Sequence, residues 1–441
     1  MKKASIFLGI LLSAFLFSMI VFKIIDINES KKMDFDSVRT QSQTGNKENN
    51  ASWVNPIRVI HERMTGSDVP IENPEKNAGI RVNGKLTKAD WDRRFASGLN
   101  EANLLRTMEK NRDLFCYQSL SDELKQLYCE IYILLSERKE ETILCSLDEK
   151  DIDTVYQYVM LDHPEIFYIC GYEYTKYTSS DKTVKIGFCG KEEEFEESLD
   201  YVQSQIDSFA EDFCAGISKD AGDYEKVKYT YEYVIFNTTY NINANHNQSI
   251  CSVMLYGQSV CQGYAKTIQF LLGKLGVSST IVYGVTKNGE MHSVNLVEMD
   301  EGNYYLDATW GDSSHVFDDQ GMECIDISYD YLLITTKELA EYFLITHPIK
   351  VLDCNETQAN YYVKENLLFS EYDINRLNAA FEPLRNRKTS FVTIKCTNRD
   401  LQNEFLDKLI GNQDIFSYLP AELESINYSM NEELCTLTFY K

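Results

Sequence analysis

Basic residues are scarce in this sequence, where 43 lysines and arginines stand against 68 aspartates and glutamates and the net charge is −25. A chain this acidic repels phosphate backbones and anionic lipid headgroups. We therefore expect no nucleic-acid partner. The acidity also keeps an exported protein soluble, which is the simpler reason for it.

The twelve cysteines lack the spacings of metal sites, because there is no CxxC pair, no repeated interval and no Cys/His cluster with zinc-like spacing. We therefore expect no metal and no other cofactor. Twelve cysteines would suit the disulfides of an exported protein, but their loose spacing predicts no pairing scheme.

A cleavage motif is missing from the N-terminus. Lys2 and Lys3 precede an uncharged run of 19 residues, 4–22, and about 20 apolar residues span a bilayer. Secretory h-regions are shorter, roughly 7–15 residues, and are followed by an A-x-A-like site, which is absent here. We predict a single-pass signal anchor at residues 1–25, with the lysines inside and the bulk of the chain extracellular. A cleaved signal peptide, which would leave a secreted protein, is the alternative.

A cysteine lies at the start of a predicted helix in the stretch GQSVCQGYAK, residues 257–266. The residues that follow put Ala265 and Leu272 on one broad apolar face, and Gly276 is a natural helix stop. The helix is therefore predicted to be buried, with the Cys261 thiol at its N-terminal end. Such a cysteine is either a small buried hydrophobe or an activated nucleophile.

Three strands separated by tight turns are predicted after this helix, at residues 279–285, 291–299 and 304–310. The second strand carries His292 and the third carries Asp307. If these two strands form a simple hairpin around a turn at 300–303, His292 does not lie opposite Asp307. The two residues are then offset by about three residues, or roughly 10 Å. A bulge, a different turn or strand tilt has to close that gap.

A thiol, an imidazole and a carboxylate in this order suit nucleophilic catalysis. A free thiol has a pKa of about 8.5, and activated cysteines lie about four units lower, a difference of roughly 5 kcal/mol. A helix N-terminus supplies at most about 2 kcal/mol, so a cation is needed beside the thiol. We predict His292 as that cation and Asp307 as the acceptor that orients the ring.

The segments SVCQGYAKTIQFLLGKLGV and MHSVNLVEMDEGNYYLDATWGD, with the spacing between them, resemble the transglutaminase-like superfamily, most strongly over residues 229–312. The resemblance implies an α+β fold with a papain-like core, in which the cysteine-bearing helix packs on an antiparallel sheet. It also implies Cys261 as nucleophile, His292 as general base and acid, and Asp307 as its orienting partner. The family usually has a tryptophan at the position of Val294. Replacement of that ring by valine is expected to loosen the packing around the imidazole or to change the substrate groove.

The oxyanion of an acyl-transfer reaction needs donors near the thiol. The backbone N–H of Cys261 is the natural donor, Gln258 is a candidate side-chain donor, and Tyr240 is a weaker one. Trp310 and Tyr305 are expected to be core residues.

At 441 residues, several domains are expected. Composition and periodicity predict the signal anchor 1–25, a disordered stalk or linker 26–100, an N-terminal α+β accessory region 101–195 and a small C-terminal α+β accessory domain 350–441. The resemblance implies the transglutaminase-like catalytic domain at residues 196–345.

The predicted function is acyl transfer through a thioester on protein or peptide amides at the cell surface or wall, by a transglutaminase-like cysteine protease or acyltransferase. Water as acceptor makes a peptidase or amidase, and an amine makes a cross-linker. The alternative is a non-catalytic surface module that keeps the fold and binds its partner without turnover.

Overall fold

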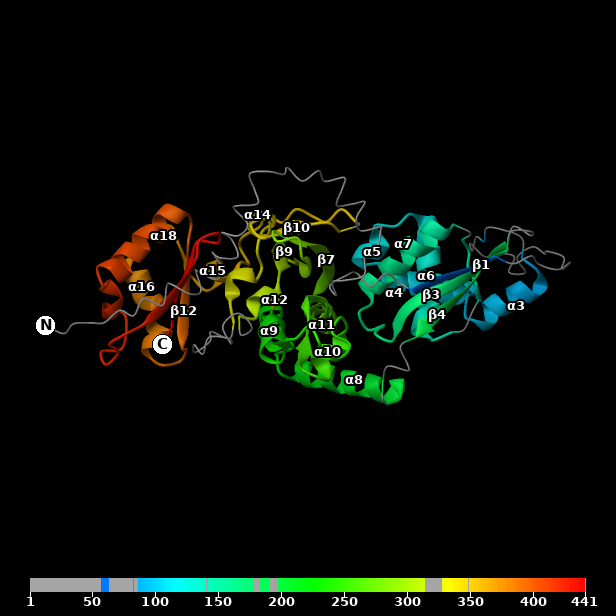
Figure 1. Ribbon diagram of the computed structural model, residues 1–441, viewed down its shortest axis with the longest axis horizontal. Helices are drawn as coiled ribbons and strands as arrows, with labels where there is room; N and C mark the ends of the chain where they lie inside the picture. Colours follow the sequence, from blue (N-terminus) through cyan, green and yellow to red (C-terminus); the bar gives the residue numbers. More distant parts are fainter. Residues whose placement is uncertain are drawn as a thin grey trace.

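The computed structural model describes residues 57–62, 82, 86–139, 142–146, 148–177, 182–190, 195, 197–313, 327–347 and 349–440. Three bodies lie in a row along the long axis of the molecule, and each is built around a four-stranded sheet (Figure 1). Within the described ranges no helix is long and apolar enough to cross a membrane. The predicted anchor at residues 1–25 lies outside these ranges.

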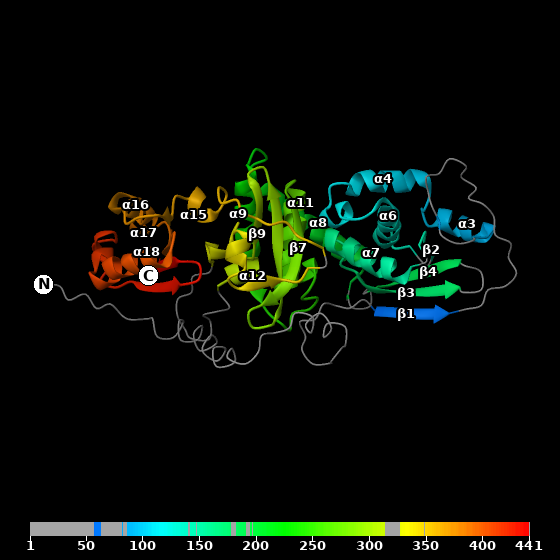
Figure 2. The ribbon, with the colours of Figure 1, turned by 90° about the horizontal axis from the view of Figure 1, so that it is seen from above.

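The N-terminal body has the strand order β1-β3-β4-β2. Its strands are β1 (Ile57–Glu62), β2 (Thr142–Ile143), β3 (Ile169–Tyr177) and β4 (Lys182–Gly190). Its helices are α3 (Lys88–Ala96), α4 (Glu101–Asn111), α5 (Phe115–Gln118), α6 (Asp122–Ser136) and α7 (Glu149–Asp162). Helices α4, α6 and α7 lie to one side of this sheet (Figure 2).

Two helices of this body have ends and buried faces that follow from their sequence. Helix α6 buries Leu127, Ile131 and Leu135 completely, because they recur every four residues on one face. Helix α7 ends at its C-cap His163, the residue before Pro164, where a proline disfavours helical geometry.

Two ordered elements lie inside the stretch 26–100 that was predicted as a stalk. Strand β1 pairs in parallel with β3. Helix α3 starts with a capping box, in which Thr87 and Asp90 each accept from the other's backbone N–H, and it buries Trp91. The stalk prediction is wrong over these elements, because average composition conceals a short capped helix with one apolar anchor.

A fully buried ion pair joins α3 to α6. The Glu130 carboxylate accepts from Arg94 Nη2 at 2.8 Å, from Gln126 Nε2 at 2.9 Å and from the Cys145 N–H at 2.8 Å. Arg94 Nη1 also donates to the Ile143 carbonyl at 2.6 Å. Both charged side chains have 0% exposure, so each depends on the other for its solvation.

Removing one member of this pair is expected to destabilise the N-terminal body. Glu130→Ala leaves a buried guanidinium without its counter-charge, and we expect a loss of about 3–5 kcal/mol in the free energy of unfolding. Urea denaturation measures this loss. The double variant Arg94→Met/Glu130→Met is the control, and it should be milder because no charge stays buried. Equal losses in the two variants would contradict the prediction.

The central body has the antiparallel strand order β10-β7-β8-β9. Its strands are β7 (Ser278–Thr286), β8 (Met291–Met299), β9 (Gly302–Leu306) and β10 (Phe343–Ile345), with a separate parallel pair β5 (Thr239–Tyr240) and β6 (Gln258–Ser259). Its helices are α8 (Leu199–Ala215), α9 (Asp223–Phe236), α10 (Ile250–Met254), α11 (Cys261–Lys274), α12 (Ala308–Gly311) and α14 (Thr336–Leu339). The predicted α+β fold class is confirmed.

The central helix α11 forms as its sequence predicts. Ile268, Leu271 and Leu272 are fully buried, and the helix packs against β7 and β8. Its C-cap is Leu275, and Gly276 follows with φ +77°, a left-handed conformation that favours glycine. This helix therefore holds Cys261 on a rigid element.

The C-terminal body has the strand order β11-β12-β14-β13. Its strands are β11 (Leu368–Phe369), β12 (Phe391–Cys396), β13 (Asn427–Asn431) and β14 (Thr436–Tyr440). Its helices are α15 (Tyr361–Lys364), α16 (Ile374–Ala380), α17 (Glu382–Arg385) and α18 (Arg399–Leu406). This body is a small α+β unit in which β13 and β14 form a hairpin, and it has a hydrophobic cluster of its own. The predicted bounds and accessory role of residues 350–441 stay a prediction.

Candidate active site

The Cys261 thiol lies at the first residue of α11, directly after the short strand β6. The N-cap residue Val260 has no side-chain acceptor, so no capping side chain occupies the first amides of this helix. Cys261 is a free thiol and is partly exposed. The sequence therefore places a reachable thiol at the positive end of a helix dipole.

Gly263, two residues after Cys261, lets the first turn of α11 pack against a pair of serines. The hydroxyls of Ser252 and Ser259 are hydrogen-bonded at 2.6 Å. A Cβ on Gly263 would lie 1.9 Å from the Ser259 hydroxyl oxygen and 2.8 Å from that of Ser252. Only glycine leaves the serine pair intact.

We expect Gly263→Ala to displace the turn that carries Cys261 and to lower the alkylation rate of that thiol by about tenfold or more. Mass spectrometry of the alkylated peptide measures the rate. The matched control is Gly273→Ala in the same helix, where an added Cβ meets nothing within 4 Å. This control should gain about 0.5–1 kcal/mol of stability and keep its reactivity. Equal reactivity of the two variants would show that the serines accommodate the methyl group.

His292 and Asp307 come together through a tighter turn than the sequence predicted. Strands β8 and β9 pair Met299 with Gly302, so the turn has two residues rather than four. Continued by one residue, this register sets Asp307 opposite Val294, two residues from His292. Such diagonal neighbours are about 7–8 Å apart, within reach of long side chains.

The third strand is shorter than predicted. It ends at Leu306, and the residues predicted to continue it form the helical turn α12. Asp307 is the N-cap of this turn, and its Oδ1 accepts from the Trp310 N–H at 3.0 Å. Its Oδ2 lies 2.7 Å from His292 Nε2. The prediction that the strand continues to residue 310 was wrong, because the capping bond turns the chain into a helix after Leu306.

Asp307 changes the charge state of the histidine. Burial alone would lower the pKa of His292, but the Asp307 carboxylate and a hydrogen bond with the Cys261 thiol outweigh burial and raise it to about 10. Because Nε2 faces Asp307, Nδ1 is the ring nitrogen left for the thiol. The three predicted residues therefore form one chain of contacts, with an imidazolium in the middle near neutral pH.

Aromatic rings surround this imidazole although the family's tryptophan is missing. Val294 is buried against Val282, its cross-strand partner. The ring centroids of Trp310 and Phe343 lie 6.2 Å and 5.9 Å from that of His292. The change to valine therefore leaves the imidazole in an aromatic environment supplied by other elements.

The asparagine after Val294 ties the histidine strand to the cysteine helix. Asn295 is buried, and its Nδ2 donates to the Ala265 carbonyl in α11 at 2.9 Å. This bond fixes β8 relative to the helix that carries Cys261. It gives a positioning role to a residue that the family motif keeps.

The predicted oxyanion donors have different surroundings. Gln258 is exposed, and its side-chain carbonyl accepts from Asn241 Nδ2 at 2.8 Å, so its role stays a prediction. Tyr240 pairs with Ser259 in the β5–β6 ladder. Burial, followed by the nearby charge of Cys261, raises the pKa of Tyr240 to about 12. Tyr240 is thus a protonated phenol close to the thiol.

Two contacts around the site were not predicted. The Asp307 N–H donates to the Tyr331 carbonyl at 3.0 Å. Gln262 Nε2 donates to the Tyr283 hydroxyl at 3.1 Å, which ties the first turn of α11 to β7. No local pattern points to Tyr331, which lies 24 residues after Asp307 and accepts its N–H through a backbone carbonyl. Tyr305 is fully buried, as predicted for a core residue.

Comparisons with known proteins found one family model and solved structures that match parts of this chain. Residues 208–308 match the model of the transglutaminase-like superfamily. One similar solved structure is a crystal structure of a TGase, with 17% identity and a TM-score of 0.23 over 36% of this chain and 48% of that chain. Another is a candidate protease from Parabacteroides distasonis ATCC 8503, with 13% identity and a TM-score of 0.20 over 30% of each chain. The chain spans about half of the first structure and under a third of the second. None of the curated proteins matches it.

Proposed function

With residues 208–308 a transglutaminase-like domain, we propose that this chain catalyses acyl transfer on protein or peptide amides through a thioester on Cys261. The observation that carries the proposal is the contact of one buried imidazole, His292, with both the Cys261 thiol and the Asp307 carboxylate. A histidine with a structural role alone would not need to hold a proton beside a thiol at a helix terminus.

The first half of the reaction makes the thioester. The Cys261 sulfur attacks the amide carbonyl carbon, and the negative charge develops on the carbonyl oxygen. The backbone N–H of Cys261 and the phenol of Tyr240 are the donors nearest to this oxygen in the proposal. The imidazolium of His292 then protonates the leaving amine, and the carbon–nitrogen bond breaks.

The second half releases the acyl group. His292, now neutral, takes a proton from water or from a lysine-type amine as that nucleophile attacks the thioester carbonyl. The carbon–sulfur bond breaks, the Cys261 sulfur leaves as a thiolate, and His292 keeps the proton, so the starting thiolate–imidazolium pair of the proposal is restored. Water yields a carboxylic acid, and an amine yields a new amide. We favour hydrolysis, because it needs no site for a second substrate.

The proposed setting is the outside of a cell, with the chain held by a single-pass anchor at residues 1–25. The support is the apolar run 4–22 behind Lys2 and Lys3. Protease treatment of intact cells should remove the bulk of the full chain. Protection of the central body in intact cells, with loss after lysis, would contradict this setting.

A product assay tests the reaction. The full chain and its Cys261→Ala variant are incubated with casein and a fluorescent primary amine. New peptide N-termini that need Cys261 identify hydrolysis of peptide bonds, and amine bound to casein glutamines identifies transfer to an amine. If the wild-type chain forms neither product and no acyl-enzyme is trapped, the enzyme proposal fails and a non-catalytic surface module is supported.

A further inference from the structure

A short segment, residues 327–334, lies between the catalytic aspartate and the C-terminal body, and we call it the strap. It runs beside β9 and α12. The backbones of Tyr305 and Ile334 exchange hydrogen bonds of 2.9 Å and 2.8 Å, and the Ser328 N–H donates to the Gly311 carbonyl at 2.8 Å. Between these two points the Tyr331 carbonyl accepts the Asp307 N–H. The strap therefore holds the backbone at Asp307 and also at residues before and after it in the sequence, Tyr305 and Gly311.

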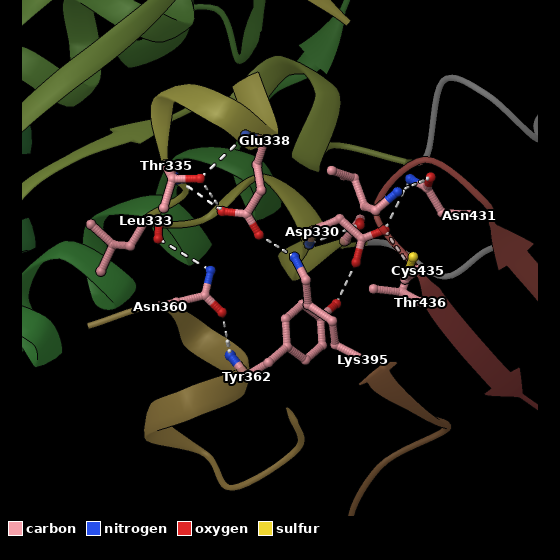
Figure 3. Close-up of polar contacts among 12 residues, drawn as sticks. Asp330, Leu333, Thr335, Glu338, Asn360, Tyr362, Lys395, Asn431, Cys435 and Thr436 are labelled. Carbon is pink, nitrogen blue, oxygen red and sulfur yellow. Dashed lines mark hydrogen bonds and ion pairs between the residues drawn. The ribbon is translucent and has the colours of Figure 1, made fainter. Parts of the chain in front are cut away.

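The strap carries a buried carboxylate that faces away from this contact. Asp330 is 6% exposed. Its oxygens accept from the Tyr362 hydroxyl, from the Thr436 hydroxyl at 2.8 Å and from Asn431 Nδ2 at 3.3 Å (Figure 3). Asn431 and Thr436 are the last residue of β13 and the first of β14. The hairpin of the C-terminal body thus binds the strap through one acid.

Electrostatics make this attachment specific. Burial raises the pKa of Asp330, while the bond from Tyr362 and the nearby Lys395 ammonium oppose that rise. A buried carboxylate is costly unless its oxygens keep their donors. Withdrawal of the hairpin would remove two of the three side-chain donors, so Asp330 resists separation of the two bodies.

One peptide unit separates this attachment from the active site. Tyr331, the next residue, bonds to Asp307 through its carbonyl. Its ring meets the rings of Trp310 and Tyr342 edge-on, with centroids 5.6 Å and 5.2 Å away. Trp310 in turn lies beside His292. A shift of Asp330 would move both the backbone partner of Asp307 and the aromatic neighbours of His292.

We infer that Asp330 is a positioning residue of the Cys-His-Asp site, and that the C-terminal body completes this site by holding the strap. Its catalytic meaning rests on the proposed function. The positional part is independent of turnover, because it concerns the contact between His292 and Asp307. A partner that displaced the β13–β14 hairpin would change the reactivity of Cys261 from a distance.

A second ion pair between the same two bodies supplies the control. Lys395 of β12 contacts Glu338 of α14 (Figure 3). Glu338 also closes a capping box with Thr335, and glutamine can keep that role. Glu338→Gln therefore weakens the interface and removes none of the side-chain hydrogen bonds that Asp330 accepts.

The test compares Asp330→Ala, Asp330→Asn and Glu338→Gln in the full chain. The first readout is the NMR titration of the His292 imidazole, assigned with His292→Gln. The second is the alkylation rate of Cys261 at pH 7. We expect Asp330→Ala to lower the pKa of His292 by about one unit, because Asp307 loses its position. The alkylation rate of Cys261 should fall about tenfold for the same reason. Asp330→Asn should restore part of both, because hydroxyl donors can turn toward its remaining oxygen. Glu338→Gln should change neither.

The inference falls if Asp330→Ala leaves the His292 titration unchanged while it lowers the melting temperature as Glu338→Gln does, since Asp330 would then only stabilise the interface. It also falls if Glu338→Gln shifts the titration equally. If alkylation of Cys261 in the wild-type chain does not depend on His292, the proposed function fails, and the titration alone still decides the role of Asp330.

Discussion

The His292→Gln variant is expected to alkylate at Cys261 about 100-fold more slowly than the wild-type chain at pH 6. The imidazole has its pKa raised to about 10 by Asp307 and the thiol, which outweigh its burial, so it is a cation at this pH. Glutamine fills the same space without a charge. The thiol then loses the cation that His292 sets beside it, so we expect its alkylation to slow.

Mass spectrometry at each cysteine across pH 4 to 10 measures this effect. Cys214 and Cys435 are partly exposed and lie on other elements, so they are internal references whose rates should not change. Burial raises the pKa of both thiols, which keeps them slow at pH 6. A wild-type Cys261 that stays inert below pH 8, or is found in a disulfide, would remove the basis of the catalytic proposal.

Local pattern was enough to predict the helix that carries the thiol. Its apolar face, its start at Cys261 and its stop at Gly276 are properties of neighbouring residues, and the structure has all three. The strand that carries His292 was also predicted with the bounds that the structure has, residues 291–299. The resemblance to a known family added the order and spacing of the three side chains.

The contact between His292 and Asp307 needed information that local pattern lacks. Whether the turn has two or four residues depends on the pairing of whole strands, and it moves Asp307 along β8. The capping bond from Trp310 to Asp307 competes with strand geometry over the same residues, and the cap prevails. The contacts of Tyr331 and Asp330 could not be predicted from the sequence. They are backbone and side-chain hydrogen bonds between elements that lie far apart in the sequence.

The Asp307→Asn variant is expected to reverse the titration of the histidine. Without the carboxylate, burial is opposed by the Cys261 thiol alone, and because burial is the largest single influence we expect the pKa of His292 to fall below its ordinary value of 6.5. The imidazole is then neutral at pH 7 and cannot protonate the leaving amine. We expect the turnover number of the proposed reaction to fall about 1000-fold, with a smaller change in KM because no group that binds substrate is removed.

The same substitution should reverse the pH dependence of stability, which can be measured without a substrate. In the wild-type chain the pKa of His292 in the folded state, about 10, exceeds its ordinary value of 6.5. The charged imidazole therefore stabilises the fold fully below pH 6.5, and this stabilisation disappears as the pH rises toward 10. In Asp307→Asn the folded pKa is the lower one, so stability falls as the pH drops below 6.5. Urea unfolding of both proteins at pH 5.5, 7.5 and 9.5 gives the difference between them. A constant difference across these three values would mean that Asp307 does not hold a proton on His292, and the proton donor of the proposed mechanism would be lost.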